Sequence, residues 1–155
     1  LKNNFNNFKI PEGRGNEKNI KIKNKKILLV NDSYNSNPAS LNEAIYNFSL
    51  RKKNKQRKIV IIGDMLELGN KSKYYHQQAA KILNKTNIDK VHCIGSEVRH
   101  TYQKLNRSKK GLLVKNISFL KENIFNLLQN NDILLVKSSN RIGLFNFFKK
   151  FNYKI

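Results

Sequence analysis

Short apolar runs separated by longer mixed segments dominate the pattern of this chain. Aliphatic residues fill most positions of five such runs, at residues 27–30, 59–62, 91–94, 112–114 and 133–136. Continuous apolar runs of this length are typical of strands that are covered on both faces, as in a parallel sheet. Ahead of the first run, Ile20 and Ile22 alternate with lysines, which predicts a half-exposed edge strand.

Apolar residues at helical spacing lie between these runs. Four segments carry such stripes: Leu41, Ala44, Ile45 and Phe48; Tyr75, Ala79, Ile82 and Leu83; Ile117, Leu120, Ile124, Leu127 and Leu128; and Phe145, Phe148 and Phe151. Strands that alternate with helices indicate βαβ crossovers, which are right-handed. The expected fold class is therefore α/β: a doubly wound, mostly parallel, Rossmann-like sheet of about six strands with helices on both faces.

Polar motifs follow three of the predicted strands. They begin at Asn31, Gly63 and Lys137, each directly after an apolar run. Ligands in doubly wound folds gather at the carboxyl ends of the strands, so we expect the three motifs to share one ligand-binding edge. Pro38 suits the first turn of the helix that follows the first motif.

The side chains of these motifs leave alternatives open. Asp32 can accept hydrogen bonds from ribose hydroxyls, or it can form an Asx turn or a helix N-cap. Lys137 and the two serines after it have the chemistry of an anion site, but they also suit a solvated loop. The spacing of Asp64, Glu67 and His76 fits no standard metal motif, so we expect no metal site there. The two acids can instead stabilise the N-terminus of the following helix.

Composition narrows the function classes. The chain has 155 residues, the size of one domain, and its formal net charge is +21. Such a charge suggests nucleic-acid binding. The lysines are spread along the chain without interleaved aromatic residues, so we do not expect nucleic acid as a partner. Cys93 lies in an apolar run, which predicts a buried thiol. No apolar run is long enough to span a membrane, and no G-x-x-x-x-G-K-[ST] phosphate loop is present.

The motifs together resemble the Mur ligases over nearly the whole chain. Residues 31–40 (NDSYNSNPAS) are similar to the D-D-S-Y-N-A-N-P segment of that family. Residues 63–69 (GDMLELG) resemble its G-D-M-x-E-L-G, with His76 at the expected distance behind. Residues 135–140 (LVKSSN) resemble its L-V-K-G-S-N, and residues 13–15 resemble the G-R-G that closes its central domain.

The resemblance implies roles for the residues of each motif. ATP would be bound by Arg14, Asp32, Tyr34, Asn35 and Asn37. Arg14 would reach the phosphates, Tyr34 and Asn35 would flank the adenine, and Asn37 would shape the turn. The substrates would be bound by Asp64, Met65, Glu67, His76, Lys137, Ser138 and Ser139, with His76 as a structural partner of its loop. No catalytic residue is assigned within this chain.

Two positions depart from the family pattern. Asn31 stands where the family has the first of two acids, which leaves Asp32 intact. Ser138 stands where the family has glycine, so a left-handed backbone at that position would be strained.

The resemblance also implies substrates, cofactors and a domain division. The activity would be ATP-dependent amide ligation in peptidoglycan precursor synthesis, with ATP and Mg²⁺ as cofactors. UDP-N-acetylmuramoyl-tripeptide and D-alanyl-D-alanine would be the substrates. Residues 1–18 would be the tail of the central ATP-binding domain and a linker, and residues 19–155 the C-terminal domain.

The chain does not begin with methionine, so we expect a fragment of a larger enzyme. Its first residues lack the apolar stretch of a secretory signal, so we expect a cytoplasmic protein, and we expect a monomer. Its N-terminal and central domains, with most magnesium ligands, would lie outside this chain. Without a phosphate loop the fragment should be inactive alone. The alternatives are another Mur-type amide ligase and a basic nucleic-acid-binding α/β module.

Overall fold

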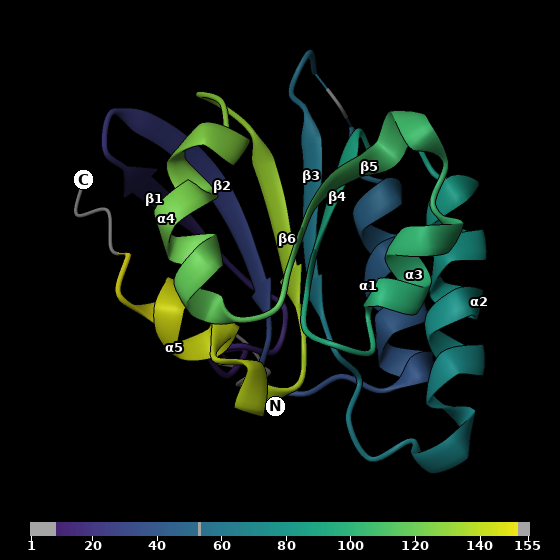
Figure 1. Ribbon diagram of the computed structural model, residues 1–155. Helices are drawn as coiled ribbons and strands as arrows, with labels where there is room; N and C mark the ends of the chain where they lie inside the picture. Colours follow the sequence, from purple (N-terminus) through teal and green to yellow (C-terminus); the bar gives the residue numbers. More distant parts are fainter. Residues whose placement is uncertain (1–8, 53, 152–155) are drawn as a thin grey trace, which may run out of the picture.

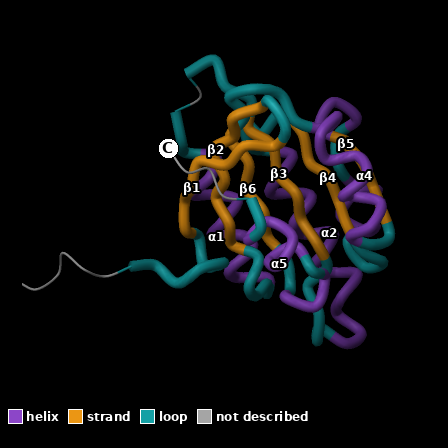
Figure 2. The backbone as a smooth tube through the Cα atoms, turned by 90° about the vertical axis from the view of Figure 1, so that its left-hand side faces the viewer, coloured by secondary structure: helices purple, strands orange, loops and turns teal. Residues whose placement is uncertain are grey.

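A six-stranded sheet forms the centre of the computed structural model, which describes residues 9–52 and 54–151 (Figure 1). The strand order is β1-β2-β6-β3-β4-β5, and Figure 2 shows the strands in this order from left to right. Five strands are parallel, and β1 pairs antiparallel with β2. The strands are β1 (Asn16–Ile22), β2 (Lys25–Asp32), β3 (Lys58–Gly63), β4 (Lys90–Ile94), β5 (Lys110–Val114) and β6 (Ile133–Lys137).

Helices cover both faces of this sheet, which confirms the predicted fold class. One face carries α1 (Pro38–Ser49), α2 (Ser72–Asn84) and α3 (Arg99–Lys104), and the other carries α4 (Ile117–Leu127) and α5 (Leu144–Lys149). Val60 and Ile62 belong to the core under the first group, and Ile59 and Ile61 to the core under the second. Successive strand residues point to opposite faces, so one apolar run supplies both cores.

The parallel strands give the sheet two different edges. At the carboxyl edge, strands lead into helices, and the three polar motifs follow β2, β3 and β6 there. At the amino edge lie the turns that lead into strands, at residues 23–24, 50–52 with 54–57, 85–89, 105–109 and 128–132. Short 3₁₀ helices complete the chain: η2 (Gly69–Lys71), η3 (Arg107–Lys109) and η4 (Asn140–Ile142).

Three elements differ from those predicted. Strand β1 begins at Asn16, so residues 16–18 of the expected linker pair with β2. Helix α5 ends at Lys149, before the last phenylalanine of its predicted stripe, and buries Leu144, Phe147 and Phe148. Helix α3 was not predicted, because it is only six residues long. Its sequence signal is Val98, Tyr102 and Leu105 at i, i+4 and i+7.

Lysine side chains satisfy carbonyl groups at helix ends, where glycine often closes a helix. The ammonium group of Lys25 donates to the carbonyl oxygens of Phe125 (2.6 Å) and Leu128 (2.7 Å) at the end of α4. Lys58 donates in the same way to the Ser49 carbonyl (2.6 Å) at the end of α1. The last carbonyl groups of a helix lack partners and carry partial negative charge, so a cation there is stabilising on both counts.

We expect Lys25→Met to lower the free energy of unfolding by about 1–2 kcal/mol, because two carbonyl groups lose a charged donor. Urea unfolding measures the change. The matched control is Lys26→Met on the same strand, where the lysine side chain is exposed. The control should change the free energy by less than about 0.5 kcal/mol. Equal effects of the two substitutions would contradict a capping role for Lys25.

A buried histidine connects β4 with β5. Nδ1 of His92 accepts the backbone N–H of Leu112 at 2.9 Å. A β-carbon at Gly111 would lie 2.4 Å from Nδ1, so the ring needs glycine beside it. Burial lowers the pKa of His92 to about 4, and the charges of Arg57 and Lys90 act in the same direction. The ring is therefore neutral in the folded protein at physiological pH.

The free energy of unfolding should fall as the pH drops from about 6.5, the usual histidine pKa, to 4. In this range His92 binds a proton in the unfolded chain but not in the folded one, because its folded pKa is about 4. The expected loss at pH 4 is about 3 kcal/mol, measured by urea unfolding at a series of pH values. His92→Asn keeps an acceptor for the Leu112 N–H and should flatten this dependence. An unchanged slope in the variant would assign the effect to other groups.

Candidate functional site

The first motif forms a capped turn between β2 and α1. The side-chain oxygen of Asn37 accepts the backbone N–H of Ser40 at 2.9 Å, and Oγ of Ser40 accepts the backbone N–H of Asn37 at 3.1 Å. These reciprocal bonds form a capping box, with Pro38 in the first turn of the helix. The polar residues at the end of the motif therefore set the direction of α1.

The last two residues of β2 point in different directions. The Asn31 side chain is buried, and its oxygen accepts the hydroxyl of Ser33 at 2.5 Å. The side chain of Asp32 is 22% exposed and lines a cavity. An acid in place of Asn31 would occupy the buried position, outside the residues that line the cavity. The departure from the family pattern at Asn31 therefore leaves the cavity carboxylate unchanged.

Lys137, at the end of β6, connects Asp32 with the turn after β2. Its ammonium nitrogen lies 3.0 Å from Oδ2 of Asp32 and donates to the carbonyl oxygen of Asn35 at 2.6 Å. The Lys137 side chain is 3% exposed, and these two acceptors offset the loss of water around its charge. Burial raises the pKa of Asp32, while Lys137 and the more distant Arg14 oppose the rise. The Asp32 carboxylate therefore faces the Lys137 ammonium group at a position that is partly shielded from water.

Residues 13–15 pack against the same turn. The backbone N–H of Tyr34 donates to the carbonyl oxygen of Gly13 at 3.0 Å. The guanidinium carbon of Arg14 lies 5.0 Å from the centre of the Tyr34 ring, a cation–π contact. Gly13 has a φ of +77°, and a β-carbon there would lie 2.6 Å from the Phe145 ring. Only glycine fits this position, which holds Arg14 beside the turn.

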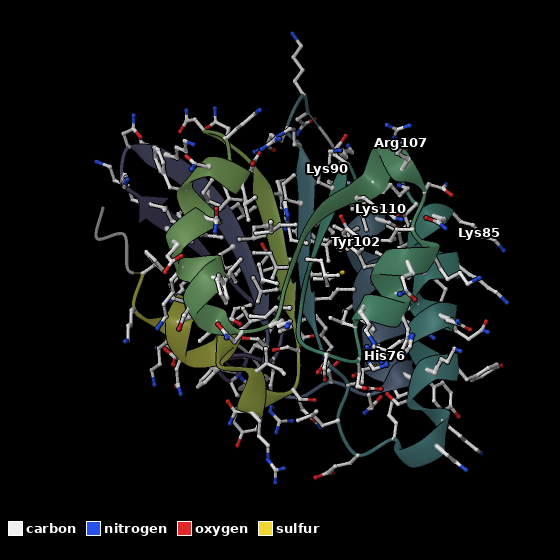
Figure 3. The ribbon with its side chains drawn as sticks, viewed as in Figure 1. His76, Lys85, Lys90, Tyr102, Arg107 and Lys110 are labelled. Atoms are coloured by element: carbon white, nitrogen blue, oxygen red, sulfur yellow. The ribbon has the colours of Figure 1, made fainter. Side chains whose placement is uncertain are left out.

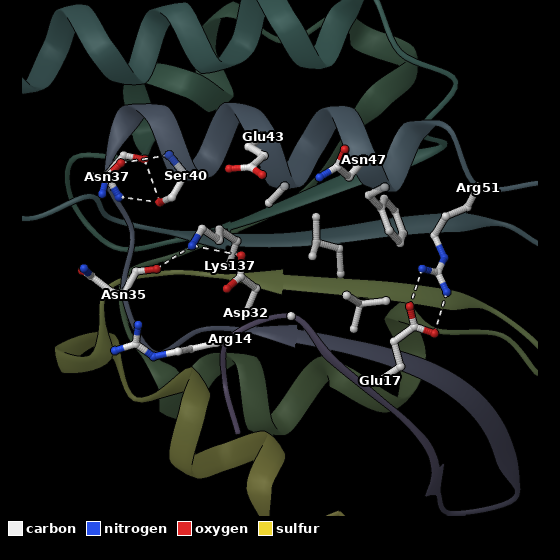
Figure 4. Close-up of a pocket in the computed structure, with 15 residues that line it drawn as sticks. Arg14, Glu17, Asp32, Asn35, Asn37, Ser40, Glu43, Asn47, Arg51 and Lys137 are labelled. Atoms are coloured by element: carbon white, nitrogen blue, oxygen red, sulfur yellow. Dashed lines mark hydrogen bonds and ion pairs between the residues drawn. The ribbon is translucent and has the colours of Figure 1, made fainter. Parts of the chain in front are cut away.

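A cavity of about 540 Å³ opens between β2, β6 and α1 (Figure 4). Five residues assigned to ATP or substrates from the sequence line it: Arg14, Asp32, Asn35, Asn37 and Lys137. Tyr34 is 43% exposed and touches this group through Arg14. A carboxylate, a guanidinium group and amide oxygens around one cavity can bind a ligand that carries hydroxyl and phosphate groups.

Sequence reasoning missed one wall of the cavity. It consists of Ser40, Glu43, Asn47 and Arg51, which lie at i, i+3, i+7 and i+11 along and just beyond α1. Arg51 forms a two-bond ion pair with Glu17 of β1, at N–O distances of 2.5 and 2.8 Å. The helical spacing of these polar residues was the available signal. It looks the same as that of an ordinary solvent-facing helix surface.

Asp64, which follows β3, binds backbone groups. It is 4% exposed, and its carboxylate accepts the N–H groups of Ser96 (3.1 Å), Glu97 (3.0 Å) and Val98 (2.8 Å). A β-carbon at Gly95 would lie 2.3 Å from Oδ1, so this loop needs glycine to approach the acid. Asp64 thus caps the loop that enters α3. The sequence had suggested instead that Asp64 could stabilise the N-terminus of the helix that follows it in the chain, α2.

His76, in α2, holds the second motif. Its Nε2 accepts the backbone N–H of Met65 at 3.2 Å, so Nδ1 carries the proton and donates to the Ser72 carbonyl at 2.9 Å. Burial lowers the pKa of His76, which favours this neutral form. Met65 is buried, while Glu67 is exposed with a φ of +64°. Glu67 is thus the side chain of this loop that is accessible to a ligand.

The third motif is bonded to the second. Oγ of Ser139 accepts the N–H of Leu66 at 3.2 Å, and the N–H of Ser139 donates to the carbonyl oxygen of Asp64 at 3.2 Å. Ser138 is fully buried and is not among the described residues with positive φ, so the strain considered for this position does not arise. A β-carbon at Gly63 would lie 2.7 Å from that of Ser138, which explains the glycine in the second motif.

The three motifs therefore meet along the carboxyl edge. The neighbouring strands β2, β6 and β3 bring them together, and direct bonds through Lys137 and Ser139 connect them. Within the described ranges, no cluster of three or more His, Cys, Asp or Glu side chains could hold a metal ion. None of the helices described here combines the length and the apolar composition that crossing a bilayer requires.

The sequence profile of the family described as "Mur ligase, glutamate ligase domain" matches residues 19–140. The match covers most of the chain and includes all three motifs of the carboxyl edge. The chain therefore belongs to the Mur ligase family, as its motifs indicated.

Curated relatives point to one branch of this family. The UDP-N-acetylmuramoyl-tripeptide–D-alanyl-D-alanine ligase of Rickettsia prowazekii is 29% identical over 87% of this chain and 29% of the relative. The ligase of the same name from Buchnera aphidicola subsp. Acyrthosiphon pisum is 34% identical over 72% of this chain and 24% of the relative. The chain spans less than a third of the length of these relatives.

Solved structures share the fold. MurF from Acinetobacter baumannii superposes with a TM-score of 0.73 at 19% identity, over 91% of this chain and 30% of that one. MurF ligase from Thermotoga maritima, in complex with ADP, has a TM-score of 0.71 at 21% identity, over 92% and 31% of the two chains. At these identities the likeness shows the fold.

Removing the carboxylate of Asp64 should destabilise the fold. Asp64→Ala leaves three backbone N–H groups without an acceptor, so we expect the free energy of unfolding to fall by about 2–4 kcal/mol. Glu67→Gln, at the exposed position of the same loop, is the control and should change it by less than about 0.5 kcal/mol. Urea unfolding gives both values. A small effect of Asp64→Ala would contradict the role of this carboxylate in holding the loop before α3.

Proposed function

We propose that residues 19–155 are the C-terminal domain of a larger ATP-dependent ligase, with residues 1–18 as the tail of its central domain and a linker. The ligase would add D-alanyl-D-alanine to UDP-N-acetylmuramoyl-tripeptide, as a cytoplasmic monomer. Membership of the Mur ligase family and the names of the relatives support this proposal.

The observation that carries the proposal is the cavity beside Asp32, Lys137 and Arg14. In the proposed ligase, Asp32 accepts hydrogen bonds from the ribose hydroxyls of ATP, and Lys137 holds that carboxylate in place. Arg14 binds phosphate oxygens with its planar guanidinium group. Tyr34 and Asn35 flank the adenine, and Asn37 shapes the turn that presents them.

The substrate side of the proposal rests on the second and third motifs. Glu67 is the exposed acid of its loop and is assigned to the incoming peptide. Asp64, Met65 and His76 act through the loop, because Asp64 accepts backbone N–H groups and His76 accepts the backbone N–H of Met65. Ser139 bonds that loop to the segment after β6, and the buried Ser138 packs against Gly63 at the start of the loop. These residues do not contact the substrates themselves. They hold the loop rigid, and the rigid loop positions Glu67 for the contact.

ATP would supply the phosphoryl group that activates the tripeptide carboxylate for attack by the dipeptide amine, releasing ADP and phosphate. By the resemblance to the Mur ligases, most of the magnesium ligands belong to the other domains of the proposed enzyme. No phosphate loop is present in the sequence, so we expect the 155-residue chain alone not to catalyse ligation. Its part is to close over the ATP site and complete it.

The role of Asp32 can be tested in the full-length ligase. Asp32→Asn should raise the KM for ATP by roughly 10- to 100-fold, because one charged hydrogen-bond acceptor is lost. The KM for the tripeptide nucleotide and for the dipeptide should stay nearly constant. Steady-state release of phosphate, with each substrate varied in turn, measures the three constants.

Glu122→Gln, on the exposed surface of α4, removes the same charge and is the control. It should leave all three constants unchanged. Urea unfolding of the Asp32→Asn variant separates a binding defect from an unstable domain. An unchanged KM for ATP in a stable variant would refute the assignment of the cavity to the nucleotide. Ligation by this chain alone would refute the domain assignment.

A further inference from the structure

The amino edge, at the end of the sheet away from Asp32 and Lys137, gathers exposed basic side chains from turns that are distant in sequence. The topology places the turns before β2, β3, β4 and β5 there, at the upper side of the molecule in Figure 1. Exposed cations come from each of these turns or from the residues next to them: Lys23, Lys26, Lys52, Lys55, Lys85 and Arg107. Figure 3 shows Arg107 and Lys85 in the upper half, with His76 of the carboxyl edge below.

The acidic residues of this edge do not balance these charges. Asp132 is buried and accepts two hydrogen bonds from the guanidinium group of Arg57, at 2.9 and 2.6 Å. Asp89 accepts the backbone N–H of Lys58 at 2.8 Å. Both carboxylates thus have partners within the fold, Asp89 at a half-buried position, and no described residue of these turns is an exposed acid. The amino edge therefore presents almost purely positive charge to the solvent.

Apolar groups lie beside these cations. Leu50 and Tyr46, at the end of α1, are 65% and 60% exposed. A shallow groove between α1 and α2, lined by Tyr46, Ile82 and Lys85, opens next to them. Exposed leucine and tyrosine with flanking lysines are the combination that proteins place at the boundary of lipid headgroups and acyl chains.

We propose that the amino edge docks on an anionic lipid bilayer. The positive charge matches the negative potential of such a surface, and Leu50 and Tyr46 add apolar contact at the headgroup level. Nucleic acid fits the same charge less well. A single exposed tyrosine is no stacking platform, and among the exposed cations described at this edge only Arg107 has the fork that reads bases and phosphates.

The orientation keeps the Asp32 end of the proposed ATP site open, whereas Arg51 of the same cavity lies beside the amino edge. Lys25 and Asp32 lie at opposite ends of β2, roughly 20 Å apart at the usual rise of a strand. In the ligase proposed above, the central domain joins through residues 13–15, which pack at the carboxyl edge. The amino edge then faces away from the other domains, so a bilayer can contact it while substrates enter from the far side.

Co-sedimentation with vesicles tests this inference. We expect the chain to bind vesicles of phosphatidylglycerol mixed with phosphatidylcholine, but not phosphatidylcholine alone, and to bind less tightly as salt is raised. The test variant combines four substitutions: Lys26→Gln, Lys52→Gln, Lys55→Gln and Lys85→Gln. Its partition coefficient should fall about 100-fold or more, because each lysine contributes separately to the attraction.

A matched variant removes the same charge from exposed lysines away from the amino edge: Lys71→Gln, Lys73→Gln, Lys115→Gln and Lys121→Gln. It should bind within about threefold of the unmodified chain. Circular dichroism checks that both variants are folded.

Three results would overturn the inference: no binding to anionic vesicles, equal losses in the two variants, or release of the vesicle-bound chain by single-stranded RNA at lower phosphate concentration than the lipid. The assay contains neither ATP nor peptide, so its failure leaves the proposed ligase function standing.

Discussion

The buried contact between Lys137 and Asp32 is the interaction on which the site depends. An ammonium group with 3% exposure is costly to desolvate, and here Asp32 and the Asn35 carbonyl surround it. The same contact ties β6 to β2 and to the turn before α1. It therefore lies at the mouth of the cavity and holds the turn that leads into the helix forming one wall. Because the buried charge of Lys137 must be paired, it fixes the positions of Asp32 and of the turn that carries Asn35.

The rest of the carboxyl edge is held by polar side chains that bind backbone groups. Asp64 accepts three N–H groups of the loop before α3, His76 accepts that of Met65, and Ser139 bonds to the second motif. Loops have few backbone partners of their own, so such bonds replace the ladder that a strand would supply. This separates residues that hold the edge from those that face the cavity, and both kinds occur within the same short motifs.

Lysine has a second structural task in this glycine-poor chain. Lys25 and Lys58 reach carbonyl groups at the ends of α4 and α1, where many proteins close the helix with glycine. Other lysines remain exposed at the amino edge. In sequence all of these lysines look alike. Their roles separate only when the fold decides which side chains lie beside a helix end and which extend into water.

The sequence by itself determined that a central sheet is covered by helices on both faces. Apolar runs and apolar helical stripes show which side chains are buried, and burial of those side chains requires this layering. It also determined that three polar motifs follow strands, and hence that they share an edge. It did not reveal α3, the α1 wall with Arg51 and Glu17, or the binding of Asp64 to backbone N–H groups. Helix α3 is too short to show a clear stripe, and the other contacts depend on which segments become neighbours in space. The position of β6 between β2 and β3, for example, lets Lys137 bond to the Asn35 carbonyl about 100 positions away in sequence. Contacts of that kind arise only from tertiary structure, since local periodicity carries no information about which distant segment will lie alongside.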